Sequence, residues 1–410
     1  MLAALRYGTG FSVHLELADQ AVLAECGTPR ALPLEDPQAA LAEALAEPLE
    51  YPPLARSTTP GDRVVLAMDS SLPQSGRMAA GVIRALVAAG VHADGITVLR
   101  TEADAEAAGA DPRPWLSEEI AGRITLGTHH PADRRELSYL AANQEGEPIV
   151  LSRALVDADV VIPVGCFHSR TTVGYHGVHS AIYPNFSDQP TLTRFLAIES
   201  RRPWGPRNRR LVREANLVGW LLGVTFTVQV IPGPGDRPLH LLAGDVRAVR
   251  RRGRQRYDEA WHSHVPAPAS LVVAAIEGDA TQQTWASVGR ALDAALPLVE
   301  EGGALALCCG LSAAPGPAVG CLAAAHSRPA ALRQIRRDRP HDALPAMQLA
   351  RALDRAHLYL LSGLDRGLVE DLDIAPLEHG EELARLARQH SSCILLSNAV
   401  HAAVTVAREP

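Results

Sequence analysis

The sequence predicts an α/β protein with two domains, in which helices flank largely parallel sheets. Short apolar runs such as DRVVLAMD, VDADVVIPV and LVVAAIEGD alternate with helical segments along the chain. Strands that alternate with helices are typical of parallel sheets. The chain has 410 residues and so exceeds the roughly 250 to 300 at which a single core stops growing, which indicates two domains.

The first domain is expected to span residues 1–265. GFSVHLEL, residues 10–17, alternates apolar and polar side chains as a half-buried strand does. The segment 33–49 begins with a proline-led, acidic turn and continues as an amphipathic helix. DRVVLAMD then predicts a strand that ends at Asp69, followed by a loop and a helix. ITLGTHH predicts a later strand, with a helix beginning at Pro131.

The second domain is expected to span residues 266–410. The run HVPAPAS is rich in proline and small residues, and a new pattern of strand and helix begins directly after it. WASVGRALDAALPLV predicts a helix, and LVVAAI, ALALCCG, HLYLLSG and CILLS predict strands. We therefore place the boundary between the two domains in the proline-rich run.

Composition excludes several classes of protein. A hydrophobic content of 47%, a charged content of 21% and a net charge of -7 are ordinary for a soluble protein. The arginines at 207–213 and 247–256 lack interleaved aromatic residues and indicate solvated helix faces, so we expect no nucleic-acid partner. The sequence shows no signal peptide and no membrane-spanning apolar run, which predicts a cytoplasmic protein with no membrane partner. The six cysteines form no CxxC pair and indicate reduced, buried thiols. A homo-oligomer remains open.

Lysine is absent from the whole chain, so that all 39 Lys and Arg residues are arginine. No side chain can therefore form a Schiff base, the lysine contact of a P-loop or a lysine-linked cofactor. The chain also lacks the GxGxxG, Walker and GxSxG motifs. These absences remove the usual support for nucleotide oxidoreductases, ATPases and common hydrolases.

Three histidines follow the strand VDADVVIPV in the segment VGCFHSRTTVGYHGVHSAIYP. His168, His176 and His179 would emerge at the carboxyl end of that strand, where open α/β sheets present their chemistry. His168 and His176 are candidate acid/base residues, because imidazole titrates near neutral pH. His176 and His179 are candidate metal ligands. Alternatively, one or more of the three is an ordinary loop histidine.

A cofactor or anion site is a second prediction from the same strand ends. Gly174 and Gly177 allow the backbone to approach an anion closely. Asp69, Ser70 and Ser71 lie between a strand and a helix, where hydroxyl and amide groups suit a phosphate. The same three residues also suit an ordinary helix N-cap, which local sequence favours.

The order of these segments resembles the lactate racemase family, whose members use a nickel-pincer nucleotide. The likeness runs from DRVVLAMDSSLP through VGCFHSRTTVGYHGVHSAIYP and LVGWLLGVTFTVQVI to WASVGRALDAALPLVEEGGALAL. It covers most of the chain in one order. The resemblance implies two α/β domains around an active-site cleft, and racemisation or epimerisation of a small anionic substrate such as a 2-hydroxy acid or sugar acid.

The resemblance also implies roles for individual residues. Asp69 and Ser71 occupy cofactor-holding positions, and His168 matches the catalytic histidine. Arg290 takes the place of a substrate-binding lysine. Ser180 falls where the family has the lysine that tethers the pincer cofactor, and serine cannot form that thioamide link.

Other family positions are also changed. Leu72 replaces a substrate-binding arginine, and no histidine stands near Leu196, where the family has a nickel ligand. The second proton-shuttling histidine is missing around Arg100 to Glu102. Any nickel or nickel-pincer nucleotide would have to bind noncovalently, and another divalent metal is an alternative. The sequence thus supports either a hydroxy acid isomerase or a divergent homologue that only binds an anionic metabolite or nucleotide.

Overall fold

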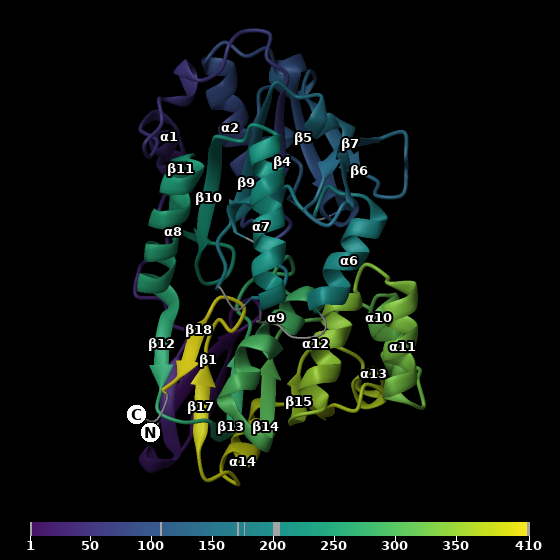
Figure 1. The fold of residues 1–410 in the computed structure, drawn as a ribbon. Helices are drawn as coiled ribbons and strands as arrows, with labels where there is room; N and C mark the ends of the chain where they lie inside the picture. The colour runs from purple at the N-terminus through teal and green to yellow at the C-terminus, as the bar shows by residue number, and fades with distance from the viewer. Residues whose placement is uncertain (1, 107–108, 170–171, 176, 200–205, 408–410) are drawn as a thin grey trace.

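The computed structural model describes residues 2–106, 109–169, 172–175, 177–199 and 206–407. Two lobes, each built around a largely parallel sheet, lie one above the other (Figure 1). Helices cover the faces of both sheets. The α/β fold class predicted from the alternation of strands and helices is confirmed.

The first sheet is parallel except at one edge, where β11 runs antiparallel to β10. Its strands, in spatial order, are β11 (Pro238–Asp245), β10 (Phe226–Pro232), β9 (Val160–Cys166), β4 (Val64–Met68), β5 (Ile96–Thr101) and β6 (Thr125–His129). The helices around it are α1 (Pro37–Ala46), α2 (Ser75–Ala88), α3 (Glu102–Glu106), α4 (Glu118–Ala121), α5 (Arg153–Val156), α6 (Gln189–Glu199), α7 (Pro206–Leu221) and α8 (Val246–Trp261).

Successive residues of β4 pack into different cores, one on each face of this sheet. Leu66 belongs to a cluster formed with α1 and α2. Val65 and Ala67 belong to a cluster formed with α6 and α7. A strand that is covered on both faces has no position for a polar side chain, and all residues of β4 are therefore apolar. The first polar side chain after it, Asp69, marks the end of the strand.

The second sheet is parallel throughout the described residues. Its strands, in spatial order, are β16 (Ala375–Leu377), β15 (His357–Leu361), β14 (Val299–Cys308), β13 (Ala269–Ala275), β17 (Cys393–Leu396) and β3 (Val22–Cys26). The helices of this lobe are α9 (Trp285–Ala295), α10 (Pro317–Ala323), α11 (Arg328–Asp338), α12 (Ala343–Leu353), α13 (Arg366–Asp371) and α14 (Gly380–Ala387).

The N-terminal strands lie with the second lobe, although the sequence grouped them with the first. β3 pairs with β17, and the hairpin of β1 (Leu2–Tyr7) and β2 (Phe11–Glu16) packs against the second sheet. The alternating pattern of GFSVHLEL reports a half-buried strand, but not which sheet buries it. The boundary at residue 265 stays a prediction. Near it, β12 (His262–Val265) pairs with β18 (Ala403–Val406).

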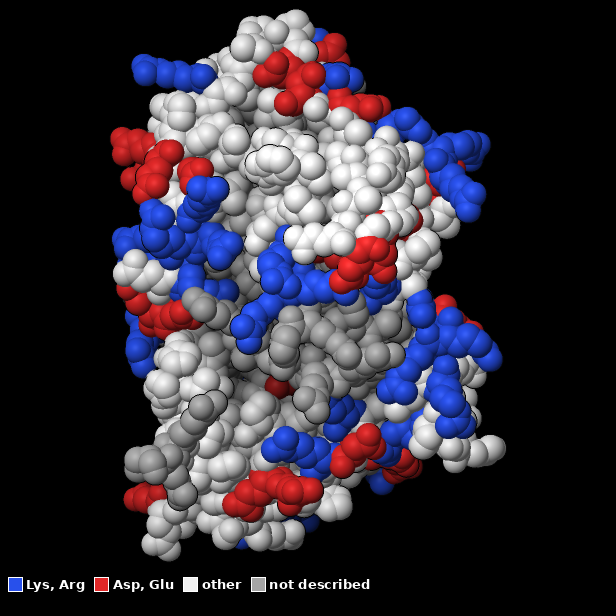
Figure 2. All heavy atoms as spheres, viewed as in Figure 1, with Lys and Arg blue, Asp and Glu red and all other residues white. Residues whose placement is uncertain are grey.

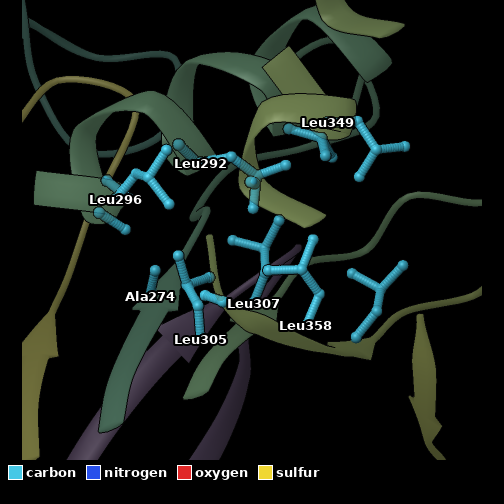
Figure 3. Packing of buried hydrophobic residues seen from close by; sticks show 14 of the residues in the cluster. Ala274, Leu292, Leu296, Leu305, Leu307, Leu349 and Leu358 are labelled. Carbon is cyan, nitrogen blue, oxygen red and sulfur yellow. The ribbon is translucent and has the colours of Figure 1, made fainter. Parts of the chain in front are cut away.

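Helices α9 and α12 cover one face of the second sheet. Figure 3 shows Leu292 of α9 and Leu349 of α12 directed toward Leu305, Leu307 and Leu358 of the sheet, and all five belong to one buried cluster. Burying a leucine side chain contributes about 1.5 to 3 kcal/mol. This packing fixes α9, which carries Arg290 on another part of its surface.

The prediction of a helix that begins at Pro131 is wrong. Residues 131–136 form turns, and an antiparallel hairpin of β7 (Leu137–Ala142) and β8 (Pro148–Ser152) follows them. The side chain of Asn143 accepts hydrogen bonds from the amides of Glu145 and Glu147, and Gly146 has a φ of 78°. Asparagine and glycine stabilise such turns, and they decide the local structure here.

All six cysteines lie among the described residues as free thiols, and five of them are buried, as their apolar surroundings predict. Within the same described ranges, no helix has the length and apolar character needed to cross a bilayer.

Candidate active site

Two buried polar side chains stand at the ends of neighbouring parallel strands of the first sheet. Asp69 follows β4 and is 8% exposed, and His168 lies two residues beyond β9 and is 4% exposed. Met68 pairs in register with Val164, so the carboxyl ends of the two strands meet at one edge. Open α/β sheets bind ligands at this edge.

A hydrogen-bond chain joins Asp69 to His168 through Ser71. The amide and the hydroxyl of Ser71 both donate to Oδ1 of Asp69, at 2.9 and 2.7 Å. The same hydroxyl oxygen lies 2.7 Å from Nε2 of His168. A serine hydroxyl has one proton, and here it points to the carboxylate. Nε2 of His168 must therefore be the donor in its bond to Ser71.

His168 thus carries its proton on Nε2 and leaves Nδ1 with a free lone pair. Nδ1 is buried and has no hydrogen-bond partner. Burial holds the pKa of His168 well below its ordinary value, and the charges of Arg290, His401 and Arg254 lower the pKa further. A neutral imidazole with an unpaired nitrogen can accept a proton from a ligand.

The carboxyl group of Asp69 is held by the same local bonds. Burial raises the pKa of Asp69, while the two hydrogen bonds from Ser71 and the charge of Arg290 act in the opposite direction. Oδ1 accepts both bonds from Ser71, so the group orients the serine. The arrangement makes Asp69 a positioning group for His168 through Ser71.

The second lobe brings Arg290 and His401 to this group. Nε of Arg290, on α9, is buried without a hydrogen-bond partner, and its guanidinium interacts electrostatically with Asp69 and His168. His401 lies in the turn after β17 and is 8% exposed, and its Nδ1 also lacks a partner. Burial, followed by the charge of Arg290, lowers the pKa of His401 to about 3.

Arg100 is a further buried cation beside the site. It occupies β5, next to β4, and is 8% exposed with an unpartnered Nε. Arg100 interacts electrostatically with Asp104, which in turn interacts with Asp69. Burial raises the pKa of Asp104 to about 6, although its bond from Thr101 lowers it. Buried guanidinium groups without full partners favour an anionic ligand.

Arginines also gather on the surface near the junction of the lobes. Figure 2 shows blue side chains at the level of α7 and α8. Arg247, Arg250 and Arg251 of α8 are exposed, and one of them, Arg251, forms an ion pair with Glu50. A local excess of positive charge attracts anions even though the whole chain has a net charge of -7.

Comparisons with known proteins bear on this site. Residues 7–198 match the lactate racemase N-terminal domain. This match spans less than half of the chain and shows its similarity to the lactate racemase family. The resemblance inferred from the sequence is therefore confirmed, and it favours an isomerase. No curated protein sequence matches the chain.

Solved structures show the same fold over the whole chain. The lactate racemase apoprotein from Thermoanaerobacterium thermosaccharolyticum superposes with a TM-score of 0.78 at 15% identity, covering 99% of this chain and 100% of its own. A protein from Thermotoga maritima gives a TM-score of 0.66 at 11% identity, covering 92% of this chain and 100% of its own. At such identities the likeness establishes the fold.

Several residues singled out by the sequence lie on a separate short helix, η5 (Val178–Ala181). Gly177 precedes η5 with a φ of 94°, and Ser180 is buried within it. His179 packs its ring on α7, where a Cβ added to Gly219 would lie 2.4 Å from the ring. Burial lowers the pKa of His179 to about 4. His176 lies outside the described residues.

The N-cap interpretation of Asp69, Ser70 and Ser71 is wrong. Helix α2 begins at Ser75, and its N-cap residue is Gln74, whose φ is 50°. Asp69 and Ser71 bond to each other and to His168 instead, and Ser70 is exposed. Gly174 is exposed with a φ of 88°, and an added Cβ there would lie 3.7 Å from Leu344 of the second lobe.

The residues of this chain do not fit the covalently held cofactor of the lactate racemase family. The chain contains no lysine, and Ser180 offers no amine for the tether. Among the residues that the structure describes, no group of three or more His, Cys, Asp or Glu side chains is placed to hold a metal ion. We therefore derive no chemical step through a nickel-pincer nucleotide.

Ser71→Ala tests the tautomer of His168. Alanine removes the acceptor for Nε2, so the imidazole can rotate or change tautomer, and the unmet donor costs about 1 to 3 kcal/mol. We expect turnover to fall roughly 10- to 100-fold. Ser71→Thr retains the hydroxyl and should restore most of the rate. Equal rates for the alanine and threonine variants would contradict the assignment.

Gly253→Ala tests how tightly α8 supports the loop that carries His168. A Cβ at residue 253 would lie 2.1 Å from the ring of Phe167, the residue before His168. Alanine favours a helix over glycine by about 1 kcal/mol, but overpacking a core costs about 1 to 3 kcal/mol. We expect a lower melting temperature and reduced turnover. A more stable, fully active variant would show that Phe167 moves freely.

Proposed function

We propose that the protein is a racemase- or epimerase-like isomerase that acts on a small 2-hydroxy acid or sugar acid in a cleft between its lobes. One observation carries the proposal: the unpaired Nδ1 of buried, neutral His168 interacts electrostatically with the guanidinium of Arg290, whose Nε is buried without a partner. An imidazole that accepts a proton and a cation that binds a carboxylate are the two groups that such a reaction requires.

The carboxylate of the substrate binds to Arg290, whose planar guanidinium can donate two parallel hydrogen bonds to it. Arg100 adds positive charge on the Asp69 side. Burial excludes water and strengthens both interactions. As a proton leaves the carbon beside the carboxylate, negative charge spreads onto the carboxylate oxygens. A cation already in place stabilises that charge without reorganising.

His168 accepts the proton through Nδ1. The bond from Nε2 to Ser71, and from Ser71 to Asp69, keeps the ring orientation and the tautomer fixed. The negative charge of Asp69 also favours the imidazolium that forms. The low resting pKa of His168 keeps the imidazole in its accepting form across the neutral range.

A cofactor enters this proposal only in noncovalent form. The described residues include no group of three or more His, Cys, Asp or Glu side chains that could hold the nickel of a pincer nucleotide or another divalent ion. The proton-transfer roles above are therefore assigned to the chain's own side chains. Denaturing mass spectrometry should return the unmodified polypeptide mass, near the 43.7 kDa of the sequence.

The test is a panel of single-enantiomer 2-hydroxy acids and sugar acids, followed by chiral chromatography, with native mass spectrometry and metal analysis of the same preparation. We expect inversion of at least one member of the panel. Tight binding of a panel member without inversion would instead support the alternative, a homologue that binds an anionic metabolite. The absence of both binding and inversion across the panel would reject both functions.

A further inference from the structure

Helix α8 holds the backbones of His168 and His401 on one of its faces. Nη1 of Arg254 donates to the carbonyl oxygen of His168 at 3.2 Å, and the hydroxyl of Tyr257 donates to that of His401 at 2.6 Å. Arg254 and Tyr257 are three residues apart, so they are neighbours on the helix surface. The Arg254 guanidinium lies 5.8 Å from the Tyr257 ring centroid. The two histidines are therefore held close together although 233 positions separate them in the sequence, from 168 to 401.

The turn that carries His401 is anchored at several points. The amide of His401 donates to the carbonyl of Asn398 at 2.9 Å, and Nδ2 of Asn398 donates to the carbonyl of Gly27 at 3.1 Å. The His401 ring lies 5.5 Å from that of Trp261, whose Nε1 donates to Pro232 at 2.9 Å. The backbone of His401 is thus fixed, and its buried Nδ1 has no hydrogen-bond partner and can accept a hydrogen bond or a proton from a ligand.

The two imidazoles reach the site from different lobes. His168 extends from the first sheet, and His401 follows a strand of the second sheet. Each has an unpaired Nδ1, and both interact electrostatically with Arg290. A substrate whose carboxylate binds Arg290 would thus lie near both imidazoles, which come from different lobes.

We propose that His401 is the second catalytic residue, which exchanges a proton with the face of the substrate carbon opposite to His168. This inference rests on the proposed function. One proton, taken up from water with the anionic substrate, resides on His401 at the start. Nδ1 of His168 removes the hydrogen of the carbon as a proton, and His401 returns its own proton to the other face. One C–H bond breaks and another forms, and no electrons are gained or lost.

The test is the exchange of the carbon-bound hydrogen with D2O, measured separately from each enantiomer by mass spectrometry. Wild-type protein should incorporate deuterium from both enantiomers as it inverts them. His401→Asn should lose inversion by about 10²- to 10⁴-fold, yet retain exchange from the one enantiomer that His168 deprotonates. His168→Asn should show the reverse preference. A purely structural role for His401 would lower exchange from both enantiomers equally.

A matched control is His264→Asn. His264 is an exposed histidine of β12, and it is hydrogen-bonded to Thr405 of the paired strand β18. The substitution should leave both activities unchanged. Should His401→Asn unfold, Tyr257→Phe removes the bond to the His401 carbonyl, along with the interaction of the Tyr257 hydroxyl with the Ser169 backbone, and should lower kcat with little change in KM.

Three results would overturn the inference. The first is inversion by the wild-type protein without deuterium incorporation, and the second is equal exchange from both enantiomers in His401→Asn. The third is full inversion activity in both Tyr257→Phe and a folded His401→Gln protein. Absence of any inversion by the wild-type protein would reject the proposed function itself. Loss of the one-sided pattern alone would reject only the role of His401.

Discussion

Replacing His168 with asparagine is expected to lower inversion of the substrate by about 10²- to 10⁴-fold, the usual contribution of a general acid or base. Asparagine can keep a donor near Ser71, but it has no basic nitrogen to replace Nδ1. The effect should therefore fall on kcat rather than on binding. Initial rates with each enantiomer, together with thermal unfolding, separate a chemical defect from a structural one.

His130→Asn is the matched control for this variant. His130 follows strand β6 of the same sheet, but it is exposed and pairs with Glu102 at 2.6 Å. Its replacement should leave the rate within a factor of about two, because exposed ion pairs contribute little. A fully active His168→Asn protein would remove the central group of the proposed mechanism.

Much of the fold could be predicted because buried parallel strands have an unmistakable composition. β4, β9 and β13 are apolar almost throughout, and each is followed by a helix. Two features could not be predicted this way. β3 pairs with β17, which lies hundreds of residues later in the sequence, and no local pattern predicts such a pairing. The β7–β8 hairpin depends on turn geometry at Asn143 that outweighs the local helical pattern.

The sequence could predict those residues of the candidate site that directly follow a strand, because the end of the strand fixes where they lie. Asp69 and His168 follow adjacent parallel strands, and this order alone places them at one edge of the sheet. Arg290 was found by resemblance to the family. His401 carried a weaker signal, a single histidine shortly after the strand CILLS. Its approach to His168 depends on the packing of the two lobes, which no local pattern encodes.

Arg290→Met is the second substitution with a large expected effect. It removes the cation that is proposed to bind the substrate carboxylate. A hydrogen bond to a charged group contributes about 1.5 to 3 kcal/mol, so kcat/KM should fall roughly 10- to 150-fold. Arg290→Lys keeps the charge without the planar fork and should lose less. Similar values of kcat/KM for the methionine variant and wild type would place the carboxylate elsewhere, for example at Arg100.

The same variant should also move the pH dependence of the reaction, and the sign follows from the charge. Arg290 lowers the pKa of both His168 and His401, because a nearby positive charge disfavours the imidazolium. Without that charge both pKa values rise toward the ordinary value, so the whole pH profile of kcat/KM shifts to higher pH. Burial, the larger cause, remains, and the shift is therefore partial. A profile that stays in place, measured over pH 4 to 9, would show that Arg290 does not face the two imidazoles.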